Sequence, residues 1–175
     1  GLLHEEVNTV AGFGLNHYRA TPKLEGDRVV WDTSLTASLD EDIIRTAAEP
    51  FSANGGLQLL TGNVGRSVIK VSAVAPERQK ISAPAKVFHS EQALKDAFAA
   101  GELEQDFVAV LSFQGTKEKG MPELNELTPV LGVIQDRGFK VALVSDGRMS
   151  GESGKVPAAI HMSPEALDGG NIAKI

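Results

Sequence analysis

A short polar segment bounded by a glycine carries the clearest candidates for chemistry. Residues 146–151 read Asp-Gly-Arg-Met-Ser-Gly, so an acid, a base and a hydroxyl follow one another closely. The apolar residues 141–144 come just before them, a pattern typical of a short buried strand. Loops that follow buried strands often bind ligands in α/β proteins, and glycines let the backbone approach a ligand closely. A polar surface turn is the alternative that the spacing leaves open.

Residues 151–155 look like the end of a phosphate-binding P-loop, but the match fails. That motif requires a glycine five residues before its last glycine and a serine or threonine after its lysine. Met149 and Val156 occupy these two positions. The sequence therefore argues against a nucleotide site of this type.

Two other features could supply ligands. Glu123 ends the polar segment 114–123, and its carboxylate suits a hard cation such as Mg²⁺. The glycine-rich residues 61–66, which include Asn63, either close a hairpin or face a ligand. Ser150 could be a nucleophile, a strong base or a plain hydrogen-bond donor, and no histidine stands near it in sequence to form a Ser-His pair.

Composition excludes several classes of protein. The formal net charge of -6 argues against non-specific nucleic-acid binding. The chain has no cysteine, which rules out disulfides and cysteine-ligated metals or clusters within these 175 residues. Its four histidines are not spaced like metal ligands. There is no long apolar run that could span a membrane and no secretory signal, so we expect a cytoplasmic protein. Both ends look cut from a longer polypeptide.

Apolar strands and amphipathic helices must position the candidate residues. We expect strands at 28–31, 57–60, 67–71, 85–88, 106–113, 141–144 and 158–162. We expect helices after Asp40, after Ser90 and from Thr128, a short helix from Ser163, and a helical turn near 4–10. This order predicts an α/β fold with a mixed, barrel-like sheet and flanking helices. A helix separates 106–113 from 141–144, so the two strands should be parallel and bring Glu123 and Ser150 to one edge.

Several motifs occur together in an informative order. Gly55-Gly56, Gly62-Asn63, Gly120-Met-Pro-Glu123, the segment 146–151 and His161-Met-Ser-Pro-Glu165 closely resemble the C-terminal region of the dihydroxyacid/6-phosphogluconate dehydratase family. Residues 4–12, 61–67 and 153–157 are most similar to the 6-phosphogluconate branch of that family. The resemblance covers essentially the whole chain.

The resemblance implies a dehydratase that converts 6-phospho-D-gluconate to 2-dehydro-3-deoxy-6-phosphogluconate and water in the Entner–Doudoroff pathway. It implies an iron–sulfur cluster, 4Fe–4S rather than another type, held by cysteines of an N-terminal domain. Residues 1–175 would then be one C-terminal swivelling β/β/α domain, with 1–35 a candidate linker from the N-terminal domain. That domain would be its partner, the whole enzyme a homodimer, and this chain alone inactive.

The resemblance also implies roles for single residues. Ser150 corresponds to the family's proposed base, which takes the proton from C2, and Glu123 to a Mg²⁺ ligand of related sugar-acid dehydratases. Arg148 and Lys155 suit the carboxylate or phosphate of an anionic substrate by their charge. The predicted substrate-binding residues are Asp146, Arg148, Gly151, Lys155 and Asn63, and no iron–sulfur ligand is expected in this chain. A dehydratase for another sugar acid or dihydroxyacid, and a non-catalytic binding module, are the alternatives.

Overall fold

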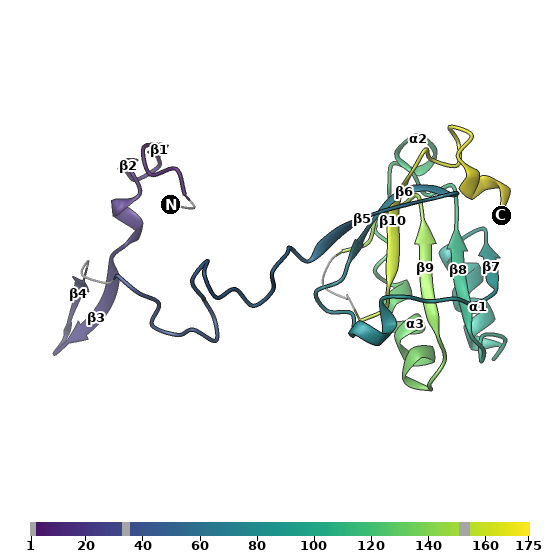
Figure 1. The fold of residues 1–175 in the computed structure, drawn as a ribbon, viewed down its shortest axis with the longest axis horizontal. Coiled ribbons are helices and arrows are strands. Elements are labelled where there is room, and N and C mark those ends of the chain that lie inside the picture. Colours follow the sequence, from purple (N-terminus) through teal and green to yellow (C-terminus); the bar gives the residue numbers. More distant parts are fainter. Residues whose placement is uncertain (1–2, 33–35, 151–154) are drawn as a thin grey trace. The chain divides into compact units, whose positions relative to one another are not determined.

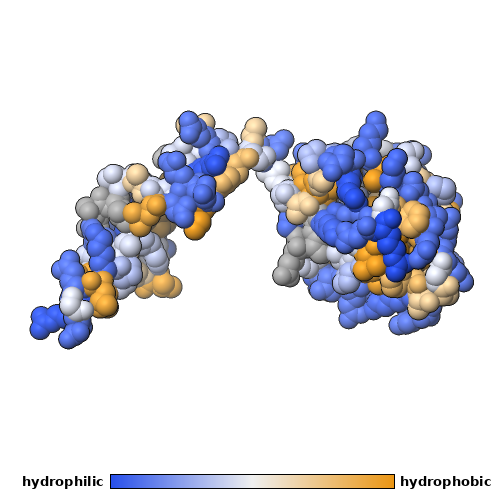
Figure 2. Space-filling view, turned by 90° about the horizontal axis from the view of Figure 1, so that it is seen from below, coloured by the Kyte–Doolittle hydropathy of each residue, from blue (hydrophilic) through white to orange (hydrophobic). Residues whose placement is uncertain are grey.

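The computed structural model describes residues 3–32, 36–150 and 155–175, which fall into two compact units, Gly1–Ala53 and Asn54–Ile175 (Figure 1). The first unit contains two small antiparallel pairs, β1 (Asn8–Thr9) with β2 (Gly12–Phe13) and β3 (Thr21–Glu25) with β4 (Arg28–Asp32). The short helix η1 (Asn16–Tyr18) lies between the pairs in sequence. None of the described side chains of this unit is buried, and hydrophobic atoms lie on its surface (Figure 2).

The second unit is built on one six-stranded sheet with the order β5-β6-β10-β9-β8-β7 (Figure 1). Its strands are β5 (Leu57–Gly62), β6 (Gly65–Lys70), β7 (Ala85–Phe88), β8 (Phe107–Leu111), β9 (Val141–Ser145) and β10 (Ala158–Ser163). Strands β7, β8, β9 and β10 are parallel, whereas β6 runs antiparallel to both β5 and β10. The sheet is therefore mixed, with its parallel part towards β7.

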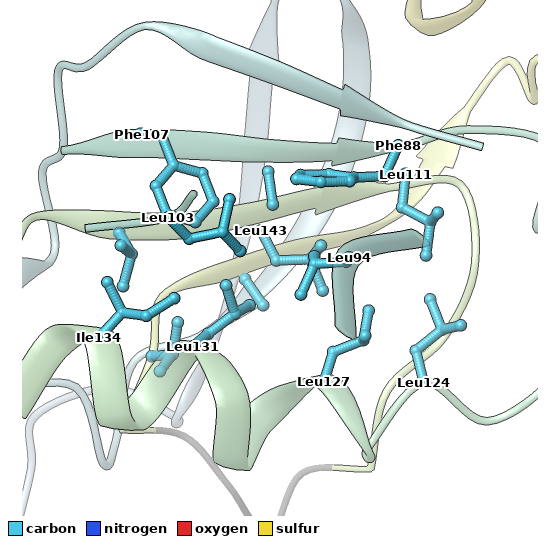
Figure 3. Packing of buried hydrophobic residues seen from close by; sticks show 14 residues of the cluster. Phe88, Leu94, Leu103, Phe107, Leu111, Leu124, Leu127, Leu131, Ile134 and Leu143 are labelled. Carbon is cyan, nitrogen blue, oxygen red and sulfur yellow. The ribbon is translucent and has the colours of Figure 1, made fainter. Parts of the chain in front are cut away.

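Two helices pack on one face of this sheet and form the main core with it. They are α1 (Glu91–Ala99) and α3 (Leu127–Asp136), which contribute Leu94 and Leu131 to the cluster. Figure 3 shows these leucines directed towards Phe107 and Leu143 of the strands. Each fully buried leucine contributes roughly 1.5–3 kcal/mol relative to an exposed one. This core fixes the strand ends from which the candidate loops leave.

Alternation along β8 separates the two faces of the sheet. Phe107, Ala109 and Leu111 belong to the helix-covered core, whereas Val110 packs with Met162 and other residues of the C-terminal segment. The remaining helices are short: η2 (Pro76–Arg78), α2 (Thr116–Lys119) and η4 (Asn171–Lys174). No helix among the described residues combines the length and the apolar character that crossing a membrane requires.

The predicted α/β class with a mixed sheet and flanking helices is confirmed. All the expected strands are present, and the hairpin alternative for residues 61–66 is correct, because Gly62 pairs with Gly65 across a tight turn. Helix α3 begins at Leu127, one residue before the expected start. The polar segment 114–123 contains the single-turn helix α2. The barrel-like shape and the swivelling behaviour stay predictions.

Three expected helical segments are wrong. Residues 41–44 form a turn rather than a helix. Ile43 and Ile44 remain exposed, so among the described residues nothing covers the apolar face that would stabilise so short a helix. Asn8–Thr9 form a strand pair instead of a helical turn. After Ser163 the chain makes tight turns that end at Gly169, whose φ of 78° stops helical propagation.

The start of α1 yields a direct stability test. The Ser90 side chain accepts a hydrogen bond from the Ala93 amide at 3.1 Å, as predicted for an N-cap. Ser90→Ala leaves this amide without its partner, so the free energy of unfolding should fall by about 1 kcal/mol. Denaturant titration followed by far-ultraviolet circular dichroism measures the change. The exposed Ser72→Ala variant is the control, and equal stability of both variants would contradict the cap.

Candidate functional site

The segments that follow β8 and β9 meet at one edge of the sheet. Glu123 and Arg148 form an isolated parallel bridge, and the Leu124 amide donates to the Arg148 carbonyl at 3.1 Å. The prediction that Glu123 and Ser150 share an edge is therefore confirmed. This arrangement follows from the parallel pairing of β8 with β9, which sends both chain segments out at their carboxyl ends.

Glu123 joins the two segments through its carboxylate. One oxygen accepts a hydrogen bond from the Ser150 amide at 2.6 Å, and the other accepts from Arg148 Nη1 at 2.9 Å. Arg148 Nε also donates to the Met121 carbonyl at 2.9 Å. The Arg148 side chain is about half exposed, so this ion pair contributes no more than roughly 1 kcal/mol to stability. Glu123 thus fixes the backbone of Ser150 and holds the guanidinium group of Arg148 close to it.

Met149 attaches the segment 146–150 to the hydrophobic core. Its side chain packs against the core cluster, and its sulfur accepts a hydrogen bond from the Thr128 hydroxyl of α3. Leu124, which is fully buried, ties the neighbouring segment to the same core. These contacts explain why Arg148 and Ser150 lie at the surface of a packed structure rather than on a free loop. Nothing in the sequence pattern indicated this role for Met149.

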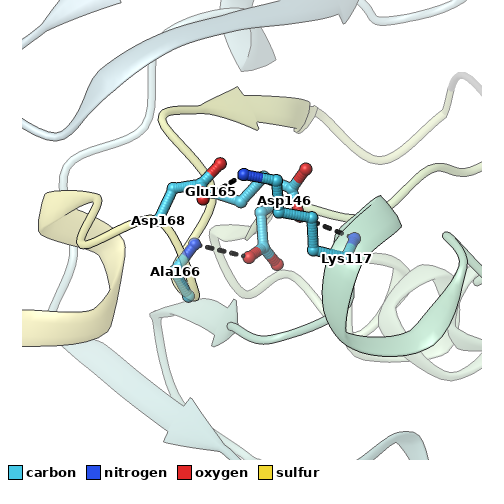
Figure 4. Close-up of polar contacts among 5 residues, drawn as sticks. All are labelled: Lys117, Asp146, Glu165, Ala166 and Asp168. Carbon is cyan, nitrogen blue, oxygen red and sulfur yellow. Dashed lines mark hydrogen bonds and ion pairs between the residues drawn. The ribbon is translucent and has the colours of Figure 1, made fainter.

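Asp146 lies below this surface and is only 1% exposed. Its two oxygens accept hydrogen bonds from the Gln114 and Ala166 amides, both at 2.9 Å. Figure 4 shows Ala166 directed at this carboxylate, with Lys117, Glu165 and Asp168 around it. The predicted contact between Asp146 and a substrate stays a prediction, and the structure gives this side chain two partners inside the protein.

A second set of contacts braces the turn that carries Ala166. Glu165 accepts a hydrogen bond from the Lys117 amide, and Lys117 Nζ pairs with Asp168 at 2.5 Å. The hydrogen bond with Asp168 raises the pKa of Lys117 above its usual value. The side chain of Gln114, almost fully buried, donates to the Ser112 carbonyl. The sequence did not reveal these roles, because the contacts of the Gln114 amide with Asp146 and of Lys117 with Glu165 and Asp168 join residues far apart in sequence.

Ser150 and Lys155 line a common groove of about 520 Å³ along α3, together with Asn125, Thr128 and Asp136. Lys155 Nζ pairs with Asp136 at 2.5 Å, and both side chains are more than half exposed. The Lys155 carbonyl accepts a hydrogen bond from the Gln135 side chain, which fixes the backbone here. The predicted residues Ser150 and Lys155 are thus brought to one surface. Gly151 lies outside the described residues.

Asn63 lies in the turn between β5 and β6. Its carbonyl accepts a hydrogen bond from the Asn171 side chain at 2.7 Å, which links the turn to η4. Gly65 of the same turn packs closely against the Ser163 carbonyl, where an added Cβ would lie at 2.6 Å. The contacts of this turn therefore lead to the C-terminal segment, and its substrate-binding role stays a prediction.

The residues that the structure describes do not complete a metal centre. Within residues 3–32, 36–150 and 155–175, no group of three or more histidine, aspartate or glutamate side chains could hold a metal ion. Glu123 offers one carboxylate, and Arg148 and the Ser150 amide already engage its two oxygens. A cation at Glu123 would have to compete with Arg148 and take its other ligands from water or from groups outside the residues that the structure describes.

Backbone strain concentrates around the segment 146–150. Phe113, Met121 and His161 are the described non-glycine residues with positive φ, at 61°, 60° and 54°. Each lies at or next to a hydrogen bond to this segment. Phe113 precedes Gln114, whose amide donates to Asp146. The Met121 carbonyl accepts from Arg148, and the His161 amide donates to the Gly147 carbonyl. Such conformations cost roughly 1–3 kcal/mol each and cluster at functional sites. The strain supports a functional role for this edge.

Comparison with known proteins agrees with the motifs. Residues 42–175 match the family model described as Dihydroxy-acid/6-phosphogluconate dehydratase C-terminal. The chain is 62% identical to a phosphogluconate dehydratase of Pseudomonas aeruginosa and 54% identical to one of Escherichia coli, each over 175 residues. It is 35% identical to a dihydroxy-acid dehydratase of Caldanaerobacter subterraneus over 179 residues. In each comparison the whole chain is covered, but only 29% of the relative. The chain belongs to the dihydroxy-acid/6-phosphogluconate dehydratase family and corresponds to its C-terminal region.

Proposed function

We propose that this chain is the C-terminal part of a phosphogluconate dehydratase. The enzyme removes water from 6-phospho-D-gluconate and yields 2-dehydro-3-deoxy-6-phosphogluconate, a step of the Entner–Doudoroff pathway. Relatives with that name are 54% and 62% identical to the chain, whereas the dihydroxy-acid dehydratase is 35% identical, which favours the sugar-acid substrate. The observation that carries the proposal is the segment 146–150, where Glu123 holds Ser150 beside Arg148.

The chemistry requires removal of the C2 proton and departure of the C3 hydroxyl as water. The resulting enol then becomes the 2-keto product. A proton next to a carboxylate is weakly acidic, so its removal needs a strong base and positive charge near the developing enediolate. Ser150 is the proposed base, and it can lose its own proton only beside strong positive charge. Arg148 brings a guanidinium to the same edge, where it can bind the substrate carboxylate.

Lys155 and the groove beside Ser150 suit the anionic part of the substrate. The exposed pair between Lys155 and Asp136 is weak enough to open when a phosphate or carboxylate binds. An iron–sulfur cluster, proposed to be of the 4Fe–4S type and held outside this chain, would act as a Lewis acid on the departing hydroxyl. Glu123 could provide one ligand to Mg²⁺.

The exposed apolar side chains of the first unit favour contact with another part of the same polypeptide. Its apolar side chains Val10, Phe13 and Trp31 are at least 63% exposed, and none of its described residues is buried (Figure 2). Relatives align across the whole chain, although the C-terminal family model begins only at residue 42. We therefore propose that residues 3–32 pack against the N-terminal domain and link it to the second unit.

We also propose that the whole enzyme is a cytoplasmic homodimer. A sugar-acid phosphate carries charge that opposes passage through lipid, which favours a cytoplasmic site of action. The dimer follows from the family resemblance alone. The proposal that residues 1–175 form one swivelling domain likewise rests on that resemblance.

The chain by itself should lack activity. Purified residues 1–175 should fold but bind no iron, because they contain no thiolate ligand, and should not dehydrate 6-phosphogluconate. Iron analysis, visible absorption and a product assay test this prediction, with the whole enzyme as the positive control. Stoichiometric iron with a visible absorption band in residues 1–175 would overturn the assignment of the cluster to another domain.

Glu123 should be essential in the whole enzyme. Glu123→Gln keeps the shape but removes the charge that pairs with Arg148 and could bind a cation. The kcat should fall by a factor of about 10²–10³, as when a group that stabilises charge in the transition state is lost. Glu104→Gln is the matched control, because Glu104 forms an exposed pair with Arg137 in the same way. Normal turnover of Glu123→Gln would show that its carboxylate is not needed.

Ser150 gives the sharpest test of the proposed base. In the whole enzyme, Ser150→Ala should lower kcat by roughly 10²–10⁴ with little change in substrate affinity, because the lost group acts in the transition state. Exchange of the C2 proton with deuterated solvent should disappear in parallel. The exposed Ser82→Ala variant should behave like wild type. Weaker substrate binding with most of kcat and the exchange retained would instead identify Ser150 as a hydrogen-bond donor.

A further inference from the structure

A buried carboxylate connects three chain segments beneath the candidate site. Asp146 immediately follows β9, Gln114 lies beyond the end of β8, and Ala166 lies in the turn after β10. One Asp146 oxygen accepts from the Gln114 amide and the other from the Ala166 amide, both at 2.9 Å. With 1% of its surface exposed, this carboxylate needs such partners, because burying an ion without them is costly.

The packing around Gly147 makes the same junction tight. A Cβ added at Gly147 would lie 2.7 Å from the Cβ of Gln114 and 2.9 Å from a methyl group of Leu124. Gly147 therefore allows the segment to lie directly against the end of β8. The Gly147 amide also donates to the Ser145 hydroxyl at 2.9 Å. Neither Asp146 nor Gly147 can shift without moving these neighbours.

Hydrogen bonds continue from this junction to the surface. The Gly147 carbonyl accepts from the His161 amide, the Arg148 carbonyl accepts from the Leu124 amide, and the Ser150 amide donates to Glu123. The first of these bonds joins the segment to β10, and the other two join it to the adjacent residues Leu124 and Glu123. Asp146 lies at the buried end of this series and Ser150 at its outer end.

We propose that Asp146 is a positioning residue that sets the place of Ser150 and Arg148 and does not contact the substrate. The inference deepens the proposed function and rests on it where it concerns turnover. It follows from the burial of Asp146 and from the engagement of both its oxygens by backbone amides. It is an alternative to the substrate contact predicted for this residue from the sequence.

Asp146→Asn tests the proposal with almost no change of shape. The amide group can accept from one backbone N–H, but its NH₂ group then faces the other N–H. In residues 1–175, hydrogen exchange followed by NMR should show faster exchange of the Gln114 or Ala166 amide, by tenfold or more. In the whole enzyme, kcat should fall by about 10²-fold, as for a misplaced catalytic group, and KM should change by a smaller factor than kcat does.

Two further variants separate position from stability. Asp106→Asn is the matched control, because Asp106 accepts from the Lys140 amide at 2.9 Å at the opposite end of β8 and β9. It should leave kcat unchanged. Gly147→Ala displaces the same segment through steric contact alone, so it should lower kcat as Asp146→Asn does. If one of the two variants folds poorly, the other still tests the proposal.

A double variant distinguishes this inference from the proposed base. If Asp146 acts through Ser150, Asp146→Asn should cause no further loss of kcat in a Ser150→Ala background. A tenfold rise in KM with unchanged kcat and unchanged amide exchange would overturn the inference and restore a substrate contact. Faster exchange with normal kcat would overturn it as well. Normal turnover of Ser150→Ala alone would refute the base, while amide exchange would still decide whether Asp146 holds the segment.

Discussion

Hydrogen bonds from backbone amides to two carboxylates hold the segment 146–150, and the geometry of the candidate site depends on them. Asp146 takes the Gln114 and Ala166 amides at the buried end, and Glu123 takes the Ser150 amide at the surface. Hydrogen bonds to a charged acceptor are roughly twice as strong as those between neutral groups. The backbone of this five-residue segment is thus held at both ends, so the sheet and its adjoining loops position Arg148 and Ser150.

The hydrophobic core makes this arrangement sustainable. A left-handed conformation at Phe113, Met121 or His161 costs roughly 1–3 kcal/mol, about as much as one buried leucine side chain contributes. The core beneath the site contains many such side chains, and Leu124 and Met149 connect it directly to the two segments at the edge. Strain at this edge is therefore small against the packing that enforces it. Since an isolated loop could not hold these conformations, the site requires the folded sheet.

Much of the fold could be predicted because its signals are local. Apolar runs located the strands, and a helix between β8 and β9 predicted that Glu123 and Ser150 would meet. The helix after Asp40 failed because an apolar pattern does not show whether a neighbouring surface exists to cover it. The role of Asp146 was hidden for another reason. Its partners are backbone amides 32 and 20 residues away. Because almost every residue has a backbone amide, no residue type in the sequence marks these partners.

The two carboxylates differ in what they permit. Asp146 is enclosed, so its contacts should persist whatever binds above it. Glu123 and Arg148 form a partly exposed pair whose stabilisation is small, so an anionic substrate can compete for the guanidinium and a cation for the carboxylate. We therefore expect the contacts of Asp146 to stay in place while the side-chain pair of Glu123 and Arg148 exchanges partners. A site with this division can stay positioned while the remaining ligands arrive from another part of the enzyme.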